Sequence, residues 1–396
     1  MQHNSKITTL AGHIPSEAQA LAPFSALVID FLAALSKSLL THREAKTHAD
    51  VAAFAFWCRK SNLKQLQQRF EDPSIRLGRG LVFHIAPGNV PVNFAYSFAF
   101  GLLAGNANII RLPSKASPSQ DFIIAAISSL FADKKYTTLA HMSALVRYEH
   151  TPKITAAFSA RCDARMIWGG DTAIADIRKA PIGPRTIEIT FADRYSFCVM
   201  CETSVAVLDS ASLKALAQAF YNDAYQMDQN ACSSPHLIVW LNACAGAGKD
   251  PFWAEVKSIA KQNYTLEPVQ AVDKYTRMLS NFVEGPDGQR TLGADTLVTR
   301  LSLQELDKNM DQLRGVFGLF YEYDAKQMDD VAHIVNNKYQ TLTYFGLEPS
   351  VLGDFVTNNH LSGIDRIVPV GTALSVDTIW DGIDILKTLS RIIDVK

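Results

Sequence analysis

One cysteine stands in a setting that suits a nucleophile. Cys232 lies in the polar loop 229–235, between a helical stretch and an apolar run that predicts a strand. The thiolate is the reactive form of cysteine, and partial exposure with hydrogen-bond donors nearby favours it. A free cysteine is more often a small buried hydrophobe, so a structural role stays open. Cys244, in an Ala/Gly turn, stays open too, whereas Cys58 and Cys162 lack a comparable context.

A second candidate is an amide donor at a predicted strand end. Asn89 follows Pro87-Gly88, directly after the apolar run 81–86 and before a helical stretch. Open α/β sheets bind ligands at the carboxyl ends of their strands, and an amide there can donate to an oxyanion. Turn statistics alone favour the plainer interpretation, in which this asparagine only makes the turn.

Two further groups could contact a nucleotide. Gly169-Gly170 stands between a predicted strand and a predicted helix, so its backbone could approach a phosphate, although the G-x-G-x-x-G pattern is incomplete. Arg111 lies at the end of another predicted strand, and Ser114 and Lys115 follow it. Two cations at that edge could grip a phosphate, or they could belong to a solvated loop.

A carboxylate and a cysteine pair complete the set of candidates. Glu188 lies in the apolar run 187–189, where alternation fits both a functional buried carboxylate and a solvated edge. Cys198 and Cys201 form a lone CxxC inside a predicted buried strand, with no second pair to complete a zinc site. The sequence has no Gly-x-Ser-x-Gly elbow, so a serine triad of that type is not indicated.

The stretches that would position these residues alternate between strand and helix. Strands are predicted at residues 81–86, 107–112, 165–168, 186–191, 196–200, 205–208, 237–241, 315–323 and 341–345, and helices at 92–104, 120–131, 171–179 and 328–336. Such alternation predicts parallel βαβ units in an α/β protein. The first 75 or so residues are predicted to be helical, with an apolar stripe at Val28, Leu32, Leu35 and Leu39.

Composition excludes several classes of protein. The 396 residues carry a net charge of −1, with 48% hydrophobic and 19% charged residues, which is incompatible with a disordered, collagen-like or coiled-coil chain. Near-neutral charge argues against a general nucleic-acid binder. Residues 81–110 contain no Asp, Glu, Lys or Arg, but Pro, Gly and Asn interrupt them, so we expect burial rather than a membrane span. The start lacks a secretory signal, and we expect a cytoplasmic protein with reduced thiols.

Taken together, these segments resemble the aldehyde dehydrogenase superfamily. Within it, the chain is most similar to the long-chain acyl-CoA reductases of bacterial bioluminescence, also called acyl-protein thioester reductases. The likeness runs from about residue 80 to the C-terminus. Its segments are Ala-Pro-Gly-Asn-Val-Pro at 86–91, Leu-Ala-Gly-Asn at 103–106, Ile-Ile-Arg-Leu-Pro-Ser at 109–114, Trp-Gly-Gly-Asp at 168–171, Glu-Ile-Thr-Phe-Ala-Asp-Arg-Tyr-Ser at 188–196, Asp-Gln-Asn-Ala-Cys-Ser-Ser-Pro at 228–235, Asp-Arg-Ile-Val-Pro-Val-Gly at 365–371 and Trp-Asp-Gly at 380–382.

The resemblance implies roles for the catalytic candidates. Cys232 matches the superfamily nucleophile and Asn89 its oxyanion-hole amide. Glu188 falls where aldehyde-oxidising members keep a general base, but the Leu-Gly-Gly that usually follows is replaced here by Ile-Thr-Phe. No metal is implied.

The resemblance also implies a cofactor site. Arg111 stands where many members place a Lys on the adenosine ribose, and Ser114 replaces the Glu of NAD-preferring members, so NADPH is favoured. Residues 315–319 replace the segment whose Glu holds the nicotinamide ribose. The residues expected to contact the cofactor are Pro87, Gly88, Arg111, Ser114, Lys115, Trp168, Gly169, Gly170 and Phe317.

The implied fold is an aldehyde dehydrogenase-like α/β fold in four parts. These are an N-terminal helical segment (1–75), a Rossmann-type NADP-binding domain (76–204), an α/β catalytic domain (205–354) and a C-terminal segment (355–396) that packs back or bridges to a partner subunit. The implied activity is NADPH-dependent reduction of a long-chain fatty acyl-CoA or acyl-protein thioester to an aldehyde, in a homo-oligomer with an acyl-protein ligase as a possible partner. The alternatives are an NAD(P)-dependent aldehyde dehydrogenase, in which Glu188 activates water, and a non-catalytic partner of such a ligase.

Overall fold

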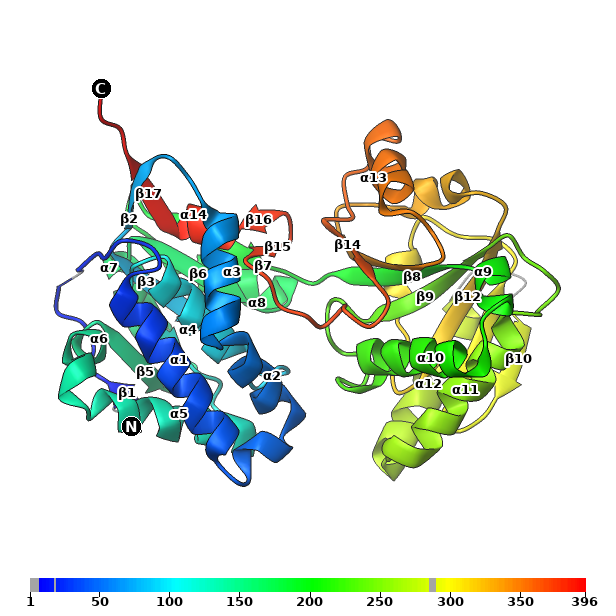
Figure 1. The fold of residues 1–396 in the computed structure, drawn as a ribbon, viewed down its shortest axis with the longest axis horizontal. Helices are drawn as coiled ribbons and strands as arrows, with labels where there is room; N and C mark the ends of the chain where they lie inside the picture. Colours follow the sequence, from blue (N-terminus) through cyan, green and yellow to red (C-terminus); the bar gives the residue numbers. More distant parts are fainter. Residues whose placement is uncertain (1–6, 18, 285–289) are drawn as a thin grey trace. The chain divides into compact units, whose positions relative to one another are not determined.

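The chain folds into two compact units. A computed structural model describes residues 7–17, 19–284 and 290–396. The first unit comprises Met1–Ala192 and Ile383–Lys396, and the second comprises Asp193–Gly382 (Figure 1).

A six-stranded sheet organises the first unit, in the order β1-β5-β4-β3-β6-β7. Its strands are β1 (Thr8–Gly12), β3 (Leu81–Ile85), β4 (Ala107–Arg111), β5 (Ser143–Arg147), β6 (Ala164–Trp168) and β7 (Ile187–Phe191). All are parallel except β1, which pairs antiparallel with β5 at the edge. From β3 the chain proceeds outward through β4 and β5, then returns to the other side of β3 for β6 and β7. The topological switch point, where such sheets bind ligands, therefore lies between β3 and β6.

Helices cover both faces of this sheet. On one face α4 (Asn93–Leu103) lies on β3 and β4, with α1 (Ala26–Thr41) and α5 (Pro118–Phe131) near it (Figure 1). On the other face, Phe158 of α7 (Pro152–Arg161) and Ile174 of α8 (Asp171–Arg178) join the core. Before the C-terminal residues, the other helices of this unit are α2 (Ala49–Trp57), α3 (Lys60–Phe70), α6 (Thr137–His141) and the short η1 (Ala45–Thr47) and η2 (Lys134–Tyr136).

The uncharged stretch 81–110 forms the centre of the first unit. It makes up β3, α4 and most of β4, and every residue of α4 from Phe94 to Leu103 is buried. A charged side chain would have no exposed position along this helix, which explains the composition. Among the described residues, no helix is long and apolar enough to span a membrane.

The C-terminal residues return to the first unit. After α14 (Ile385–Leu389), strand β17 (Ser390–Ile393) pairs antiparallel with β2 (Ile75–Gly78). The Nδ2 of Asn106, at the end of α4, donates to the carbonyl oxygen of Leu389 at 3.0 Å. These contacts fix the last residues against the helix that supports the predicted cofactor turns.

A seven-stranded sheet organises the second unit, in the order β10-β11-β12-β9-β8-β13-β14. Its strands are β8 (Tyr195–Cys201), β9 (Pro235–Leu241), β10 (Arg290–Ala294), β11 (Thr299–Leu303), β12 (Leu319–Ala325), β13 (Tyr339–Phe345) and β14 (Arg366–Pro369). Neighbouring strands are parallel except β10, which pairs antiparallel with β11.

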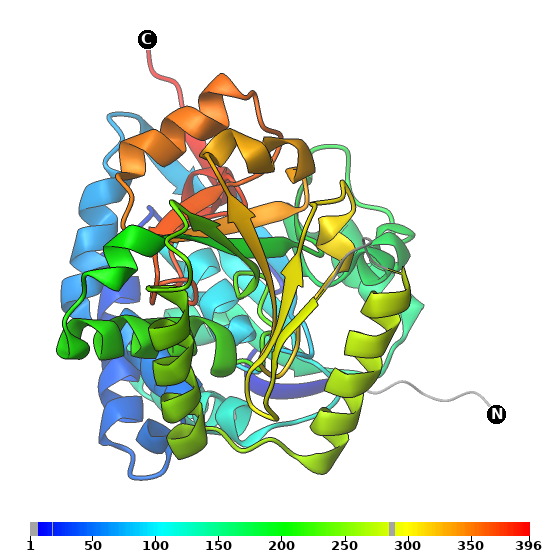
Figure 2. The same cartoon turned by 90° about the vertical axis from the view of Figure 1, so that its right-hand side faces the viewer.

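The two faces of this sheet are covered differently (Figure 2). Helices α10 (Ser210–Tyr225) and α11 (Lys249–Asn263) pack on one face, around Phe220 and Trp253. The other face contacts α13 (Pro349–Asn358), the 3₁₀ helix η4 (Met328–Ile334) and Met278 of α12 (Pro268–Glu284). The remaining short elements are α9 (Glu202–Ala206), η3 (Met310–Gln312), β15 (Ile379–Trp380) and, beyond the second unit, β16 (Ile383–Asp384).

The two units divide the chain differently from the predicted domains. The strand expected at 196–200 was placed in the cofactor domain, but β8 pairs with β9 and β13 in the second sheet, so the second unit begins at Asp193 rather than at residue 205. Helices α1 to α3 belong to the first unit and do not form a separate segment. The C-terminal segment is shared, with residues 355–382 in the second unit and the rest in the first.

Some predicted elements also differ. The prediction of a strand at 205–208 is wrong, because residues 202–206 form helix α9. The strand expected at 315–323 begins only at Leu319, after a turn in which Phe317 and Gly318 have φ of 53° and 81°. Strands β1, β5 and β11 were not predicted at all.

Candidate active site

Two turns meet at the switch point of the first sheet. Pro87, Gly88 and Asn89 follow β3, and Gly169-Gly170 follows β6, the adjacent strand. Gly88, Asn89 and Gly170 are exposed. A Cβ added to Gly88 or Gly170 would meet no atom within 4 Å, so both backbones are open to an approaching group. The predicted turns thus come together at the edge where a dinucleotide would bind.

A buried polar network holds the residue before the glycine turn. The indole Nε1 of Trp168 donates to Ser97 Oγ at 3.0 Å, and its ring stacks on Phe191 at 3.7 Å. Ser97 Oγ lies 2.8 Å from His84 Nδ1, while His84 Nε2 lies 3.0 Å from Asn108 Oδ1. Burial lowers the pKa of His84 to about 4, so the imidazole is neutral. His84 is a positioning residue for Trp168.

A cationic group lies at the end of β4. The guanidinium of Arg111 lies 5.0 Å from the centroid of the Tyr148 ring. Its Nε is buried and finds no hydrogen-bond partner among the residues that the structure describes. Ser114 and Lys115 follow as exposed side chains. An unused buried donor, followed in the same loop by a second cation, fits an anionic ligand such as a nucleotide phosphate.

Arg147, which the sequence did not single out, braces this loop. It ends β5, next to β4, and its Nε donates to the carbonyl oxygen of Pro113 at 3.0 Å. Its Nη2 donates to Gln120 Oε1 at 3.3 Å. The alternation that revealed the other strands did not reveal β5, so its terminal arginine carried no signal.

Glu188 is engaged in an ion-pair cluster. It lies opposite Arg165 in the β6–β7 pairing, and its Oε2 accepts from Arg165 Nε at 2.7 Å and also from Nη2. Its Oε1 accepts from Arg178 Nε at 2.7 Å. Burial raises the pKa of Glu188, but the hydrogen bonds from Arg178 and Arg165 outweigh it and hold the pKa below 4.5. A carboxylate with both oxygens bound to guanidinium groups is poorly suited to accept a proton from water.

Cys232 lies in the second unit, at the amino ends of its parallel strands. The loop carrying it joins α10 to β9, and Cys232 is a free cysteine that is partly exposed as a residue. Its carbonyl oxygen accepts from Ser196 Oγ at 2.7 Å, and Ser234 Oγ donates to the carbonyl oxygen of Asp223 at 2.7 Å. Both flanks of the nucleophile candidate are therefore fixed to neighbouring elements.

The loop before Cys232 is held as firmly. Asp228 and Gln229 have φ of 54° and 59°, a conformation that non-glycine residues rarely adopt. Gln229 is 2% exposed; its Oε1 accepts from the N–H of Gly318 at 2.8 Å and its Nε2 donates to the carbonyl oxygen of Leu319 at 3.1 Å. A strained backbone of this kind persists only where surrounding contacts hold it in place, and it is typical of functional sites.

Several segments of the family resemblance brace the second unit near this loop. Asp193 accepts from Arg314 through both carboxylate oxygens, at 2.8 and 2.9 Å, and Arg194 forms an ion pair with Asp365. Asp223 accepts from the backbone N–H groups of residues 371 and 373 at 2.6 and 2.9 Å. The matched residues around 193 and 365–371 thus have a structural explanation.

A side-chain amide lies within hydrogen-bond distance of the thiol. Gln340 Nε2 lies 3.5 Å from Cys232 Sγ and also donates to Asp381. Burial, together with the charge of Asp381, raises the pKa of the thiol to about 11. The resting cysteine is therefore protonated at neutral pH and must lose its proton before it can attack a substrate.

The remaining candidates are less informative. Phe317 is 9% exposed, so little of its side chain is free for a cofactor. All six cysteines are free, including Cys198 and Cys201 of the CxxC. The structure shows no metal-ligating group of three or more His, Cys, Asp or Glu side chains within the described ranges.

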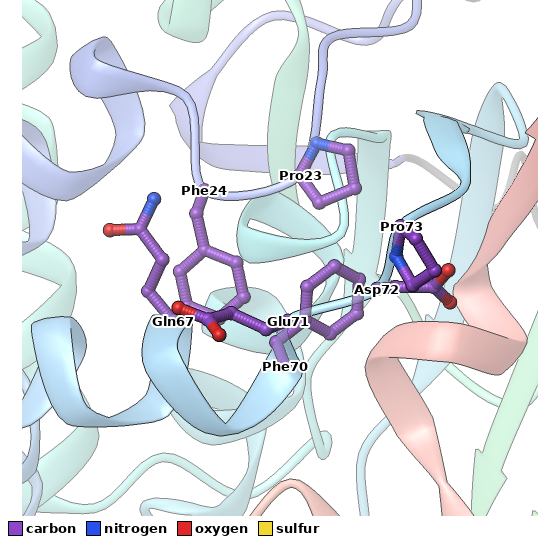
Figure 3. A pocket seen from close by; sticks show the side chains of 7 residues that line it. All are labelled: Pro23, Phe24, Gln67, Phe70, Glu71, Asp72 and Pro73. Atoms are coloured by element: carbon purple, nitrogen blue, oxygen red, sulfur yellow. The ribbon is translucent and has the colours of Figure 1, made fainter.

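A hollow on the first unit contains none of these candidates (Figure 3). Its volume is about 600 Å³, and it is lined by Pro23, Phe24, Gln67, Phe70, Glu71, Asp72 and Pro73. Phe24 and Phe70 pack at 5.3 Å between ring centroids, and Asp72 already accepts from Arg76 at 2.8 Å.

Solved structures share the fold. An indole-3-acetaldehyde dehydrogenase complexed with NAD⁺ aligns with a TM-score of 0.64 at 13% identity, covering 93% of this chain and 82% of that one. The NADP-dependent glyceraldehyde-3-phosphate dehydrogenase of Bacillus halodurans, complexed with NADP, aligns with a TM-score of 0.62 at 15% identity, covering 92% and 85%. The predicted aldehyde dehydrogenase-like α/β fold is confirmed.

Sequence comparisons point to one branch. The chain is 24% identical over 311 residues to the long-chain acyl-protein thioester reductase of Vibrio harveyi, covering 74% of this chain and 59% of that protein. It is 27% identical over 169 residues to the protein of the same name from Photorhabdus luminescens, covering 42% and 32%. The chain thus spans less than two thirds of the length of these curated relatives. The model of the acyl-CoA reductase (LuxC) family matches residues 37–261, more than half of the chain. The chain therefore belongs to the acyl-CoA reductase (LuxC) family.

Proposed function

We propose that this chain reduces a long-chain fatty acyl thioester, acyl-CoA or acyl-protein, to a fatty aldehyde with NADPH, through an S-acyl intermediate on Cys232. The observation that carries the proposal is the braced loop that presents a partly exposed Cys232 beside Gln340. Family membership and the names of the relatives from Vibrio harveyi and Photorhabdus luminescens support the substrate class.

Cys232 performs the covalent chemistry. Its thiolate forms a bond to the thioester carbonyl carbon, and the carbonyl electrons move to oxygen. Asn89 and the backbone N–H of Cys232 donate to this oxyanion. Collapse breaks the bond to the departing sulfur, which leaves as a thiolate and takes up a proton, so that the acyl group remains on Cys232. The Cys232 sulfur departs in turn when the aldehyde forms.

The first unit holds the cofactor. The turns at Gly88 and Gly170 would hold the pyrophosphate, and Arg111 and Lys115 would hold the phosphate on the adenosine ribose. The open backbones and the unused Arg111 Nε support this assignment. Bound NADPH supplies the hydride. The NADP complex of the Bacillus halodurans structure is a precedent on the same fold.

The rival activity, aldehyde oxidation to an acid, would need Glu188 to activate water. Its engagement with Arg165 and Arg178 favours reduction. The test is to follow NADPH oxidation across acyl-CoA chain lengths, and NAD(P)⁺ reduction with the matching aldehydes. Thioester-dependent NADPH oxidation that yields aldehyde supports the proposal. Acid formation without thioester reduction would refute it.

We expect Asn89→Ala to lower kcat for thioester reduction by about 10²- to 10³-fold, because one oxyanion donor is typically worth about 2.7–4 kcal/mol. KM for the acyl thioester should change little, since the donor acts mainly on the transition state. Steady-state kinetics with saturating NADPH measures both values. Asn359→Ala, at the exposed C-cap of α13, is the matched control. An unchanged kcat in Asn89→Ala would remove Asn89 from the mechanism.

We expect Arg111→Ala to raise KM for NADPH about 10- to 100-fold, as the loss of a hydrogen bond between charged groups predicts. KM for NADH should rise less, because NADH lacks the extra phosphate. The exposed Arg391→Ala, on β17, controls for the loss of one positive charge. Equal losses for the two cofactors would show that Arg111 does not select NADPH.

The assembly is a further part of the proposal. We propose a homo-oligomer that receives acyl groups from an acyl-activating ligase, as the resemblance implies. Size-exclusion chromatography with light scattering, with and without such a ligase, tests both associations.

A further inference from the structure

The amide of Gln340 touches the reacting atom of the proposed mechanism. Gln340 is the second residue of β13 and is 1% exposed. Its Nε2 lies 3.5 Å from Cys232 Sγ and also donates to Asp381 Oδ1. Its Oε1 accepts from Thr341 Oγ1 at 3.3 Å. All four residues belong to the second unit.

These partners determine which end of the amide faces the sulfur. An ionised carboxylate only accepts hydrogen bonds, so Asp381 selects the nitrogen end of Gln340. The Thr341 hydroxyl satisfies the oxygen end. A flipped amide would set its oxygen against the Asp381 carboxylate. The two N–H bonds of Gln340 are thus shared between Asp381 and Cys232 Sγ.

Asp381 is itself held in place by a constrained turn. It has φ of 49°, and Gly382 follows with φ of 71°. A Cβ on Gly382 would approach Asp365 Oδ1 to 3.0 Å. Trp380, just before it, lies under the guanidinium of Arg366 at 5.0 Å from the ring centroid. The turn is therefore fixed on both sides of the carboxylate.

We propose that Gln340 is a catalytic residue that stabilises the Cys232 thiolate, and that Asp381 is the positioning residue that aims its amide. This inference rests on the proposed function. An N–H donor to sulfur stabilises the Cys232 thiolate before it attacks and again when it departs. The nearby Asp381 charge opposes thiolate formation, so it keeps Cys232 protonated between turnovers.

Other charged groups also act on the sulfur. Arg194 lowers the thiol pKa, as Gln340 does, whereas Asp381 raises it. Arg366 is also within electrostatic reach of Cys232. Gln340 and Asp381 therefore act in opposite directions on one thiol, and this opposition can be measured.

The test is alkylation of Cys232 by iodoacetamide in the full chain, without substrate or cofactor, followed by mass spectrometry of the Cys232 peptide from pH 7 to 10. Gln340→Leu removes the hydrogen-bond donor and should lower the fraction of Cys232 present as thiolate about tenfold. The less stabilised thiolate is a stronger nucleophile, which partly offsets this loss, so alkylation should slow about three- to fourfold. Asp381→Asn keeps an acceptor but removes the charge, and should accelerate alkylation. Asp354→Asn, exposed on α13, should change nothing.

Opposite shifts in the two variants support the proposal. Shifts of the same sign, or none, overturn it, because a merely structural role would not separate the two variants. If Gln340→Leu fails to fold, Gln340→Asn withdraws the amide from the sulfur while keeping its polarity, and the same slowing is expected. Since no acyl substrate is used, a chain that makes no aldehyde would refute the proposed function without affecting this result.

Discussion

Cys232→Ala is expected to lower aldehyde formation by at least about 10³-fold, because it removes the proposed attachment site of the acyl group. Incubation of the unmodified protein with acyl-CoA, without NADPH, should add one acyl mass to the Cys232 peptide. Cys232→Ala should show no such adduct. The fold should persist, since the loop is held by the Ser196, Ser234 and Gln229 hydrogen bonds rather than by the thiol.

Cys244→Ala is the matched control for this experiment. Cys244 is also a free, partly exposed cysteine in a loop of the second unit. Its backbone N–H donates to the Glu202 carboxylate at 2.9 Å. This variant should keep both the adduct and the activity. An adduct on Cys244, or an unmodified Cys232, would contradict the covalent step.

Much of the first unit could be predicted because its signals are local. The buried strand β3, its Pro-Gly-Asn turn and the glycine pair after β6 each stand in one short run of sequence. Their adjacency follows from parallel topology, which places the carboxyl ends of neighbouring strands at one edge. Strand β5 was not predicted because Ser143–Arg147 follows a helical stretch without a turn signal. Its last residue, Arg147, was therefore not identified either.

The surroundings of Cys232 could not be predicted in the same way. Gln340 lies 108 residues from Cys232 and directly precedes the predicted strand 341–345, so no local pattern singled it out. Asp381 belonged to a matched Trp-Asp-Gly segment, but only the folded turn shows what its carboxylate contacts. Long-range pairs of this kind depend on strand order, which the sequence does not state.

Glu188 shows how a correctly located residue can have a different role. Its position on a strand was predicted, and the resemblance suggested a general base. The directly opposed Arg165 lies 23 residues earlier and is 2% exposed, which no local pattern reveals. Burial raises the Glu188 pKa, but the two arginines lower it below 4.5. The Glu188 carboxylate therefore binds a proton more readily in the unfolded chain than in the folded protein. The stability that the pair contributes is complete above about pH 4.5 and is lost as the pH falls through the depressed value.

Glu188→Ala is expected to destabilise the protein by about 3–5 kcal/mol, because it leaves the buried guanidinium of Arg165 without a counter-charge. Urea unfolding at pH 7 measures the loss. Its magnitude should shrink in acid, where the unmodified carboxylate is protonated as well. Lys179→Ala, which breaks an exposed ion pair with Asp176 nearby, should cost less than about 1 kcal/mol.

The double variant Arg165→Met with Glu188→Leu separates stability from catalysis. Replacing both partners by apolar side chains removes the unpaired charge, so most of the lost stability should return. If Glu188 only holds β7 against β6, this variant should reduce acyl thioesters with an unchanged dependence of kcat on pH. If Glu188 were a general base, kcat would fall by about 10²- to 10⁴-fold in a protein of restored stability, and an apparent pKa would vanish from the profile. The kcat of the double variant therefore distinguishes a reductase, in which Glu188 is structural, from a dehydrogenase, in which Glu188 is the general base.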